Sequence, residues 1–270
     1  MSFTQYDIDG LIFHRADALH SAGDLMHGFA TRTGGVSEAE FSSLNLGRSR
    51  GDKPASVREN YRRFASALGG SLDRLVLCRQ VHSDHVEVVT EADALPDLYS
   101  PTPFEADGLI TNVPGLALAV FYADCIPVLL YDPIKKVVAA VHSGWRGTAR
   151  GIAGKAVARM QEQFSCDPSQ ILAAIGPGIC EQCFETHEDV PLAMRNLFGA
   201  ESDTFITPLP TEKFQVNLKG MIAHTLRLCG LLPEHIDDLS LCTACHPELY
   251  WSHRRLGEAR GNQAAIIALQ

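Results

Sequence analysis

The sequence has few of the features that mark a protein for a membrane, for export or for nucleic acid. Acidic side chains outnumber basic ones, 32 to 23, among 270 residues, which gives a formal net charge of -9. This charge argues against nucleic acid or an acidic membrane as a partner held by bulk electrostatics, although a local basic pocket for a small anion remains compatible with it. No apolar run approaches the ~20 residues that a bilayer span needs, and the amino-terminal MSFTQYDIDGLIFHRAD carries acids early and has no long apolar core, unlike a signal peptide. We therefore expect a cytoplasmic protein.

Internal repeats, low-complexity tracts and linker-like gaps are also missing, which favours a single domain over residues 1–270. Hydrophobic residues make up 46% and charged residues 20% of the chain, ordinary values for a globular protein. Eight cysteines without a secretion signal indicate reduced thiols, which are more often metal ligands, nucleophiles or core filler than disulfides.

Hydrophobic patterning predicts a mixed α/β (α+β) domain in which sheets are flanked by helices. Pro54 and Gly69 bracket a helix over 54–68, and Thr148 is expected to cap a helix that ends near Phe164. Further helices are predicted within 188–198 and 218–230. Strands are predicted from β-branched and aromatic content at 74–78, 85–89, 116–122, 127–131, 137–141, 171–175, 236–242 and 262–269. Residues 27–51, rich in Gly, Ser, Thr and Arg, are expected to form an ordered loop.

A thiol and an imidazole are expected to face each other at the end of one hairpin. The stretch ADCIPVLLYDPIKKVVAAVHSG contains two strands around a turn at Asp132-Pro133. A turn centred on Pro133-Ile134 pairs Cys125 with His142, and directly opposed residues share a face of the sheet. A slip of one residue would separate them, and Pro127 predicts an edge strand or a bulge.

His82, in QVHSD, is the natural third member of this group because it also follows a strand. Two imidazoles and a thiolate suit zinc, and three protein ligands leave a fourth position for water or substrate. The competing interpretation is that each residue alone is a buried thiol or a hydrogen-bonded histidine at the end of a strand.

The residues after His142, SGWRGT, combine glycines with an arginine at the expected start of a helix. Glycines allow backbone to approach a ligand, and Arg146 with free helix N–H groups would form a cradle for phosphate or carboxylate. An ordinary turn with a surface arginine is the alternative, since no P-loop or G-x-G-x-x-G pattern supports anion binding.

The motifs TRTGGVS, SLNLG, QVHSD, ADGLIT, ADCIPVLLYD, VHSGWRGT, AIGPGI and CTACHPELYWSHRR occur in this order from about residue 27 to the carboxyl terminus. This series resembles the YfiH-type laccase-domain family of purine nucleoside phosphorylases, once called multicopper polyphenol oxidases. The resemblance implies one mixed α/β domain of packed sheets with outer helices, and a zinc ion bound by His82, Cys125 and His142. Two segments, FETHEDV and EARGNQ, depart from the usual family pattern.

The resemblance further implies phosphorolysis of adenosine, inosine and S-methyl-5′-thioadenosine, together with deamination of adenosine. A nucleoside and phosphate are then the expected small-molecule partners. Arg146 would bind phosphate, and Arg32 and Asn45 are candidates for further anion or ribose contacts, though loop residues of these types are often structural. A zinc-bound water would serve deamination. Asp124 either shuttles protons beside the metal or ties down a turn.

Three other activities remain open. Cys125 as nucleophile with His142 as base would make a metal-free amide hydrolase, and the resemblance includes a proposed role of this kind, removal of wrongly incorporated serine from a peptidoglycan precursor (UDP-MurNAc-L-Ser). A copper oxidase is disfavoured because the sequence has no His-x-His pair, although copper could substitute for zinc in the trio. The last alternative is a non-catalytic metal-binding module.

Two further patterns imitate zinc sites. His85-Val86-Glu87 with Cys180-Glu181-Gln182-Cys183 resembles a zinc deaminase signature, but the gap is too long and Ile179 replaces its proline. The Cys180/Cys183 and Cys242/Cys245 pairs lie much farther apart than the ~15–20 residues usual between such pairs, so ordinary reduced cysteines are favoured over a structural zinc site.

Overall fold

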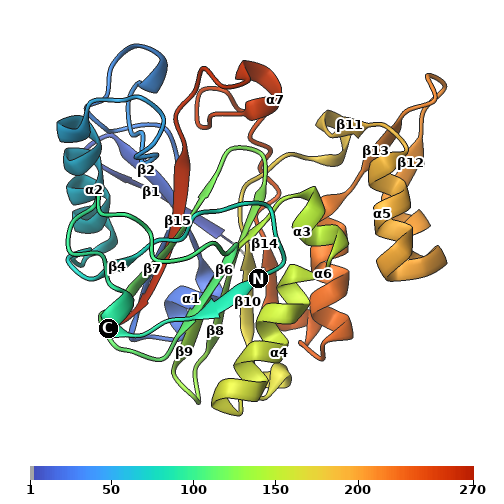
Figure 1. Ribbon diagram of the computed structural model, residues 1–270, viewed down its shortest axis with the longest axis horizontal. Helices are drawn as coiled ribbons and strands as arrows, with labels where there is room; N and C mark the ends of the chain where they lie inside the picture. Colours follow the sequence, from blue (N-terminus) through green and yellow to red (C-terminus); the bar gives the residue numbers. More distant parts are fainter. Residues whose placement is uncertain (1–2) are drawn as a thin grey trace.

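Two six-stranded sheets pack face to face in the computed structural model, which describes residues 3–270 (Figure 1). The first sheet has the order β1 (Phe3–Ile8), β2 (Leu11–Ala16), β3 (Leu25–Ala30), β15 (Gln263–Leu269), β7 (Ala117–Tyr122) and β4 (Leu75–Val76). The second has the order β14 (Ile236–Asp238), β10 (Leu172–Ile175), β8 (Ile126–Asp132), β9 (Val137–Ser143), β6 (Gly108–Thr111) and β5 (Val86–Val88). This mixed architecture confirms the predicted fold class.

Helices cover the outer face of each sheet, so the molecule has four layers. Helix α2 (Pro54–Leu68) lies on the first sheet, and α4 (Ile152–Phe164) and α6 (Leu218–Leu228) lie on the second. Three short helices complete the layers and their connections: α1 (Asp17–Ser21), α3 (Trp145–Ala149) and α7 (His253–Leu256). None of the helices within residues 3–270 is both long and apolar enough to cross a bilayer.

Strands β8 and β9 are buried on both faces because they lie between the first sheet and the helices. Val128 and Leu130 face α4 and α6, whereas Leu129 and Tyr131 face the first sheet. Successive side chains of a strand point to opposite faces, which explains why both segments are continuous apolar runs rather than alternating ones. Strand β8 is central, between β10 and β9, so the predicted edge position of Pro127 is wrong. Its ladder with β10 begins only at Val128, so Pro127 lies near the start of the strand.

The β8–β9 register differs by two residues from the predicted one. Pro127, not Cys125, pairs with His142, because the turn spans the four residues after Asp132 and is centred one residue later than predicted. A shift of two residues preserves the face on which each side chain lies, whereas a shift of one would reverse it. Cys125 and His142 therefore still lie on the face toward the first sheet.

Helix α2 has the predicted bounds, and Gly69 ends it in the left-handed conformation at φ 84°. The predicted helix beginning at Thr148 is wrong at its amino-terminal end. Residues 145–149 form the short helix α3, and Gly151, at φ 71°, separates it from α4. Thr148 does not cap α4, because its hydroxyl donates within α3 to the carbonyl of Gly144.

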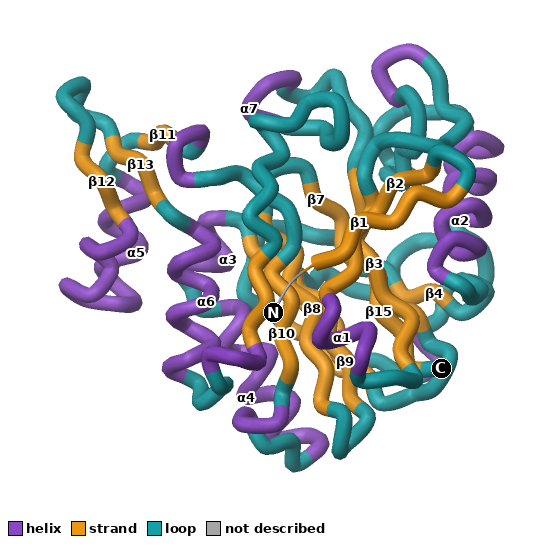
Figure 2. Tube along the Cα trace, turned by 180° about the vertical axis from the view of Figure 1, so that it is seen from behind, coloured by secondary structure: helices purple, strands orange, loops and turns teal. Residues whose placement is uncertain are grey.

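A small outlying lobe, residues 185–216, stands beside α6 (Figures 1 and 2). It contains helix α5 (Asp189–Phe198) and a three-stranded sheet of β11 (Glu185–Thr186), β13 (Phe214–Val216) and β12 (Ile206–Pro208). Backbone and side-chain contacts join the lobe to the segment that follows β10. This segment also forms one wall of the candidate site.

Candidate active site

Three donor side chains converge where β8 begins and β9 ends. His142 is the penultimate residue of β9 and is buried, Cys125 directly precedes β8, and His82 lies exposed in the loop between β4 and β5. The Sγ of Cys125 lies 3.7 Å from Nε2 of His82, and the donor atoms of all three lie within 4.8 Å of one another. The structure therefore brings together the trio that the sequence singles out.

Asp107, which sequence reasoning missed, orients two members of this trio. Its buried carboxylate accepts a hydrogen bond from Nδ1 of His142 at 2.8 Å and from the backbone N–H of His82 at 3.1 Å. It also accepts from the N–H and hydroxyl of Ser83 at 2.6 and 2.7 Å. These bonds hold the loop while His82 adopts a φ of 59°, and they direct Nε2 of His142 toward Cys125. The feature of the sequence that could have revealed Asp107 is its place in the motif ADGLIT, immediately before β6.

Gly144 leaves room for an ion among the three donors. A Cβ at this position would lie 2.9 Å from Sγ of Cys125 and 2.9 Å from Cδ2 of His82. The φ of Gly144 is -72°, so glycine is required here for space rather than for an unusual backbone conformation. One thiolate and two imidazoles around such a space fit a tetrahedral ion with one open position.

The trio is electrostatically suited to hold a thiolate. Burial alone would raise the pKa of the Cys125 thiol, but His142 and then His82 lower it to about 6. Burial would lower the pKa of His142, but Cys125 and Asp107 raise it to about 9. Burial likewise opposes ionisation of Asp107, yet the contacts with His142 and Ser83 lower its pKa to about 2. The thiolate is the form of cysteine that binds metals and the form that acts as a nucleophile.

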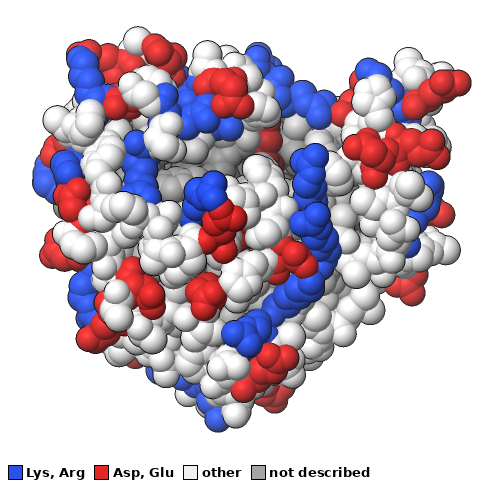
Figure 3. Space-filling model, viewed as in Figure 1, with Lys and Arg blue, Asp and Glu red and all other residues white. Residues whose placement is uncertain are grey.

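Two cavities meet at the trio, and arginine is prominent in both. The first has a volume of about 400 Å³ and the second about 490 Å³, and His82, Cys125, Arg50 and Arg260 line both. Arg48, Arg79, Gln80, Tyr122 and Asn262 are among the other residues of the first, and Asp124, Trp145, Arg146, Phe184 and Arg254 of the second. Figure 3 shows a hollow below α7 with Lys and Arg side chains around its rim.

Arg260 is a candidate for binding an anion next to the trio, since it lines both cavities. Burial lowers the pKa of its guanidinium, and its buried Nε has no hydrogen-bond partner within residues 3–270. Its Nη1 donates to the carbonyl of Gly261 and to the side chain of Asn262. By contrast, Arg50 already pairs with Glu258 at 2.8 Å. Sequence reasoning missed Arg260, which stands only in a segment that departs from the family pattern.

The other predicted site residues occupy different positions. Arg146 lines the second cavity, and its guanidinium lies 4.2 Å from the centroid of the Trp145 ring. Arg32 stacks on Trp251 and donates to the carbonyls of Ser42 and Pro247. It is not among the residues that line either cavity.

Asn45 and Asp124 are held by hydrogen bonds to neighbouring loops. Asn45 is fully buried, accepts from the N–H of Asn262 at 3.0 Å and donates to Asp52, so it touches the first cavity only through Asn262. Asp124, at φ 98°, accepts from the hydroxyl of Thr243 and from the N–H of Arg254, each at 2.6 Å. These contacts favour the turn-holding alternative for Asp124.

The two Cys-x-x-Cys pairs also come together, although their spacing in the sequence favoured separate thiols. The Sγ atoms of Cys180, Cys183, Cys242 and Cys245 lie within 4.8 Å of one another. The gap closes because Gly178 and Cys242 form a parallel β-bridge, which aligns the segments after β10 and β14. This cluster is a second candidate metal site.

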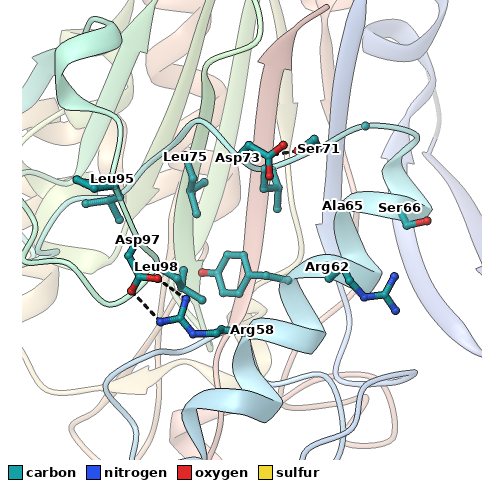
Figure 4. Close-up of a pocket in the computed structure, with 14 residues that line it drawn as sticks. Arg58, Arg62, Ala65, Ser66, Ser71, Asp73, Leu75, Leu95, Asp97 and Leu98 are labelled. Atoms are coloured by element: carbon teal, nitrogen blue, oxygen red, sulfur yellow. Dashed lines mark hydrogen bonds and ion pairs between the residues drawn. The ribbon is translucent and has the colours of Figure 1, made fainter.

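A third cavity, about 500 Å³ in volume, lies against α2 and away from the trio (Figure 4). Its Arg58 reaches across to Asp97, with the two guanidinium–carboxylate contacts at 2.5 and 2.8 Å. The pair neutralises itself, and no thiol or imidazole lines this cavity. We therefore place the chemistry at the trio.

Residues 26–270 match the protein family described as multi-copper polyphenol oxidoreductase laccase. The chain belongs to this laccase-domain family, as its motifs indicate. The crystal structure of the Bacillus licheniformis hypothetical protein YfiH superimposes with a TM-score of 0.91 at 32% identity, covering 98% of each chain.

Two curated relatives carry the same functional name. A Deinococcus radiodurans protein named purine nucleoside phosphorylase is 41% identical over 245 residues, which cover 90% of this chain and 88% of that protein. The mouse protein named purine nucleoside phosphorylase LACC1 is 35% identical over 254 residues, 92% of this chain. The chain spans only 56% of the length of the mouse protein.

Proposed function

We propose that this protein is a zinc-dependent purine nucleoside phosphorylase that acts on adenosine, inosine and S-methyl-5′-thioadenosine and also deaminates adenosine. The observation that carries the proposal is the trio of His82, Cys125 and His142 beside a cavity lined by arginines. The names of relatives that match most of this chain support the phosphorylase activity. In this proposal residues 1–270 act as one catalytic domain, because the strands of both sheets and the loops between them contribute to the cavities.

The arginines would bind phosphate and hold it beside the glycosidic carbon of the nucleoside. Arg260 supplies a buried donor without a protein partner, and charge-assisted bonds from guanidinium to phosphate are among the stronger hydrogen bonds in proteins. Arg146, from the second cavity, is a candidate for the same anion or for the nucleoside. Positioning of the two reactants in one cavity accounts for a large share of such catalysis.

Zinc, when bound by the trio, would supply a Lewis acid and an activated water. Asp107 keeps the imidazole of His142 in the tautomer that presents Nε2, and it holds the loop of His82. The site is also half-open, since His82 is exposed, which gives a nucleoside access to the metal-facing side. Copper could substitute for zinc in this donor set.

We place the protein in the cytoplasm. All eight cysteines are free thiols, including Cys183 and Cys245, which lie 3.5 Å apart. Unpaired thiols at this distance fit a reducing compartment.

Phosphate-dependent release of the purine base tests the proposal. The assay compares hypoxanthine release from inosine with and without phosphate, for wild type, Cys125→Ala and His142→Ala, alongside metal content. We expect activity only with phosphate, and loss of both the activity and the zinc of the trio in the two variants. A folded, zinc-loaded wild type that releases no base from any of the three nucleosides would contradict the proposal.

A Cys–His amide hydrolase is the second candidate, because Cys125, His142 and Asp107 lie in the order nucleophile, base and orienting carboxylate. The low pKa of Cys125 is consistent with this role. Metal analysis separates the two candidates directly. A folded wild type that has no metal at the trio and is inactivated by alkylation of Cys125 would favour the hydrolase.

A further inference from the structure

Four thiols from two distant segments meet beside the candidate active site without belonging to it. Cys180 directly precedes the 3₁₀ turn Glu181–Cys183, which Cys183 ends, and Cys242 and Cys245 belong to the turn that follows β14. The Sγ of Cys245 lies 3.5 Å from that of Cys183 and 4.0 Å from that of Cys180. None of the four takes part in a disulfide.

These separations fit one tetrahedral ion. Zinc–sulfur bonds of ~2.3 Å place tetrahedral thiolates ~3.8 Å apart. A disulfide needs sulfurs at ~2.05 Å, and a cluster of several irons holds its thiolates farther apart than a single ion does. The N–H of Cys180 donates to Sγ of Cys242 at 3.2 Å, a contact that stabilises a thiolate.

A buried positive charge also lies next to the four thiols. Lys219 is 7% exposed, and its ammonium donates to the carbonyls of Leu239 and Leu241, directly before Cys242. The same ammonium lies 3.5 Å from the carboxylate of Asp238, which shares its charge with the thiols. A cation at this position offsets part of the negative charge that four thiolates around one divalent ion retain. With four protein ligands, such a site is closed to substrate, which is the arrangement of structural zinc.

We propose that Cys180, Cys183, Cys242 and Cys245 bind one structural zinc ion that is distinct from the ion of the trio. The ion fastens the outlying lobe, residues 185–216, to the body of the protein. Gln215 and Thr207 of the lobe hydrogen-bond to Gln182 and Glu181, which lie between the two cysteines of the first pair.

The same ion would stabilise one wall of the active site. Phe184, next to Cys183, lines the second cavity, and Thr243, next to Cys242, donates to the carboxylate of Asp124. Asp124 in turn precedes Cys125. The cluster is thus positioned to affect substrate binding indirectly, without touching the reacting atoms.

Metal content tests the site independently of any activity. Zinc is measured by mass spectrometry in wild type, in Cys183→Ser/Cys245→Ser, and in Cys229→Ser, a matched control that removes a half-buried thiol outside both groups. We expect about two equivalents per chain in wild type and in the control, and about one in the double variant. Retention of the full wild-type metal content by a folded double variant would overturn the proposal, as would iron in place of zinc.

Alkylation of the native wild type covers the case in which the double variant does not fold. Cys245 is exposed, so without a bound ion it should react at once. We expect peptide mapping to show Cys183 and Cys245 protected until a chelator is added. Immediate alkylation of both, with no change in metal content, would refute a zinc at this cluster.

Metal analysis of Cys125→Ala distinguishes an absence of zinc at the four-cysteine cluster from a failure of the proposed function. Cys125→Ala removes a ligand of the trio and leaves all four cluster thiols in place. If Cys125→Ala keeps the wild-type metal content while the double variant loses zinc, the structural site stands and the zinc of the trio does not. The opposite result rejects the structural site alone.

Discussion

The Oδ1 atom of Asp107 lies 2.8 Å from Nδ1 of His142, and the same carboxylate accepts hydrogen bonds from the backbone of the His82 loop. One buried side chain thus fixes the orientation of two of the three donors. Carboxylates that bond to metal-binding histidines in this way select the tautomer and increase the basicity of the ligand. The geometry of the site therefore depends on Asp107 as much as on the trio itself.

Asp107→Asn should weaken zinc binding about 10- to 100-fold and lower kcat, because an amide of the same shape carries no charge to support the imidazole. The KM for the nucleoside should change little. Competition with a chelator and steady-state kinetics measure these effects. Asp73→Asn, at an exposed position away from the trio, is the control. Wild-type zinc affinity in Asp107→Asn would show that the carboxylate has no role in metal binding.

Gly144→Ala should abolish metal binding at the trio while the fold survives. The added Cβ would lie 2.9 Å from Sγ of Cys125, and alanine readily adopts the backbone conformation of Gly144. Circular dichroism and thermal unfolding should resemble those of wild type, whereas the zinc of the trio should be lost with the activity. A variant with full zinc and full activity would mean that the three donors do not surround an ion at this point.

Arg260→Gln should raise the KM for phosphate about 10- to 100-fold, since hydrogen bonds to charged groups contribute about 1.5–3 kcal/mol. The KM for inosine should rise far less, because the proposed contact is with the anion. Initial rates measured over a grid of both substrates separate the two effects. Arg195→Gln removes an exposed arginine that pairs with Asp203 in the lobe and serves as the matched control. Equal increases in both KM values would contradict a phosphate contact.

Two buried histidines should make the fold less stable in acid. Burial lowers the pKa of His27 to about 3 and that of His14 to about 4, whereas an unfolded histidine titrates near ~6.5. Between these values the unfolded chain binds more protons than the folded one, so the free energy of unfolding falls as the pH drops below ~6.5. Their contribution is fully present above that pH.

His27→Gln should reduce the slope of this pH dependence. The glutamine oxygen can replace Nε2 as acceptor of the Ala16 N–H, and one titrating group is removed. Urea unfolding at a series of pH values measures the slope, and His20→Gln, an exposed substitution on α1, is the control. If wild type and His27→Gln lose stability in parallel from pH 6.5 to 4, His27 is not the source of the effect.

The elements around the trio could be predicted because their signals are local. Pro54 and Gly69 mark the ends of α2, and the apolar runs of β8 and β9 flank a proline turn. The prediction for the hairpin was wrong in the length of its turn, because the sequence does not show whether two or four residues connect β8 to β9. The predicted proximity of Cys125 and His142 is nevertheless correct, because a two-residue shift of register leaves each side chain on the same face of the sheet.

The parts that could not be predicted depend on contacts between distant segments. Residues 27–30 are predicted to be loop because of the glycine and polar residues around them, but they belong to β3. They form a strand because they pair with β15, which is distant in the sequence. Asp107 and His142 are 35 residues apart, and the two Cys-x-x-Cys pairs meet because β10 pairs with β14 and Gly178 forms a bridge to Cys242. Helix α3 is separate from α4 because Gly151 adopts a left-handed conformation, which a glycine permits but does not require.

The most direct test of the central claim is an anomalous difference map, recorded at the zinc absorption edge, from crystals of a preparation that phosphorolyses inosine. We expect a peak at the trio, ~2.0–2.3 Å from Nε2 of His82, Sγ of Cys125 and Nε2 of His142, with the fourth position open toward the arginine-lined cavities. An active preparation whose crystals show no anomalous density among these three side chains would contradict it.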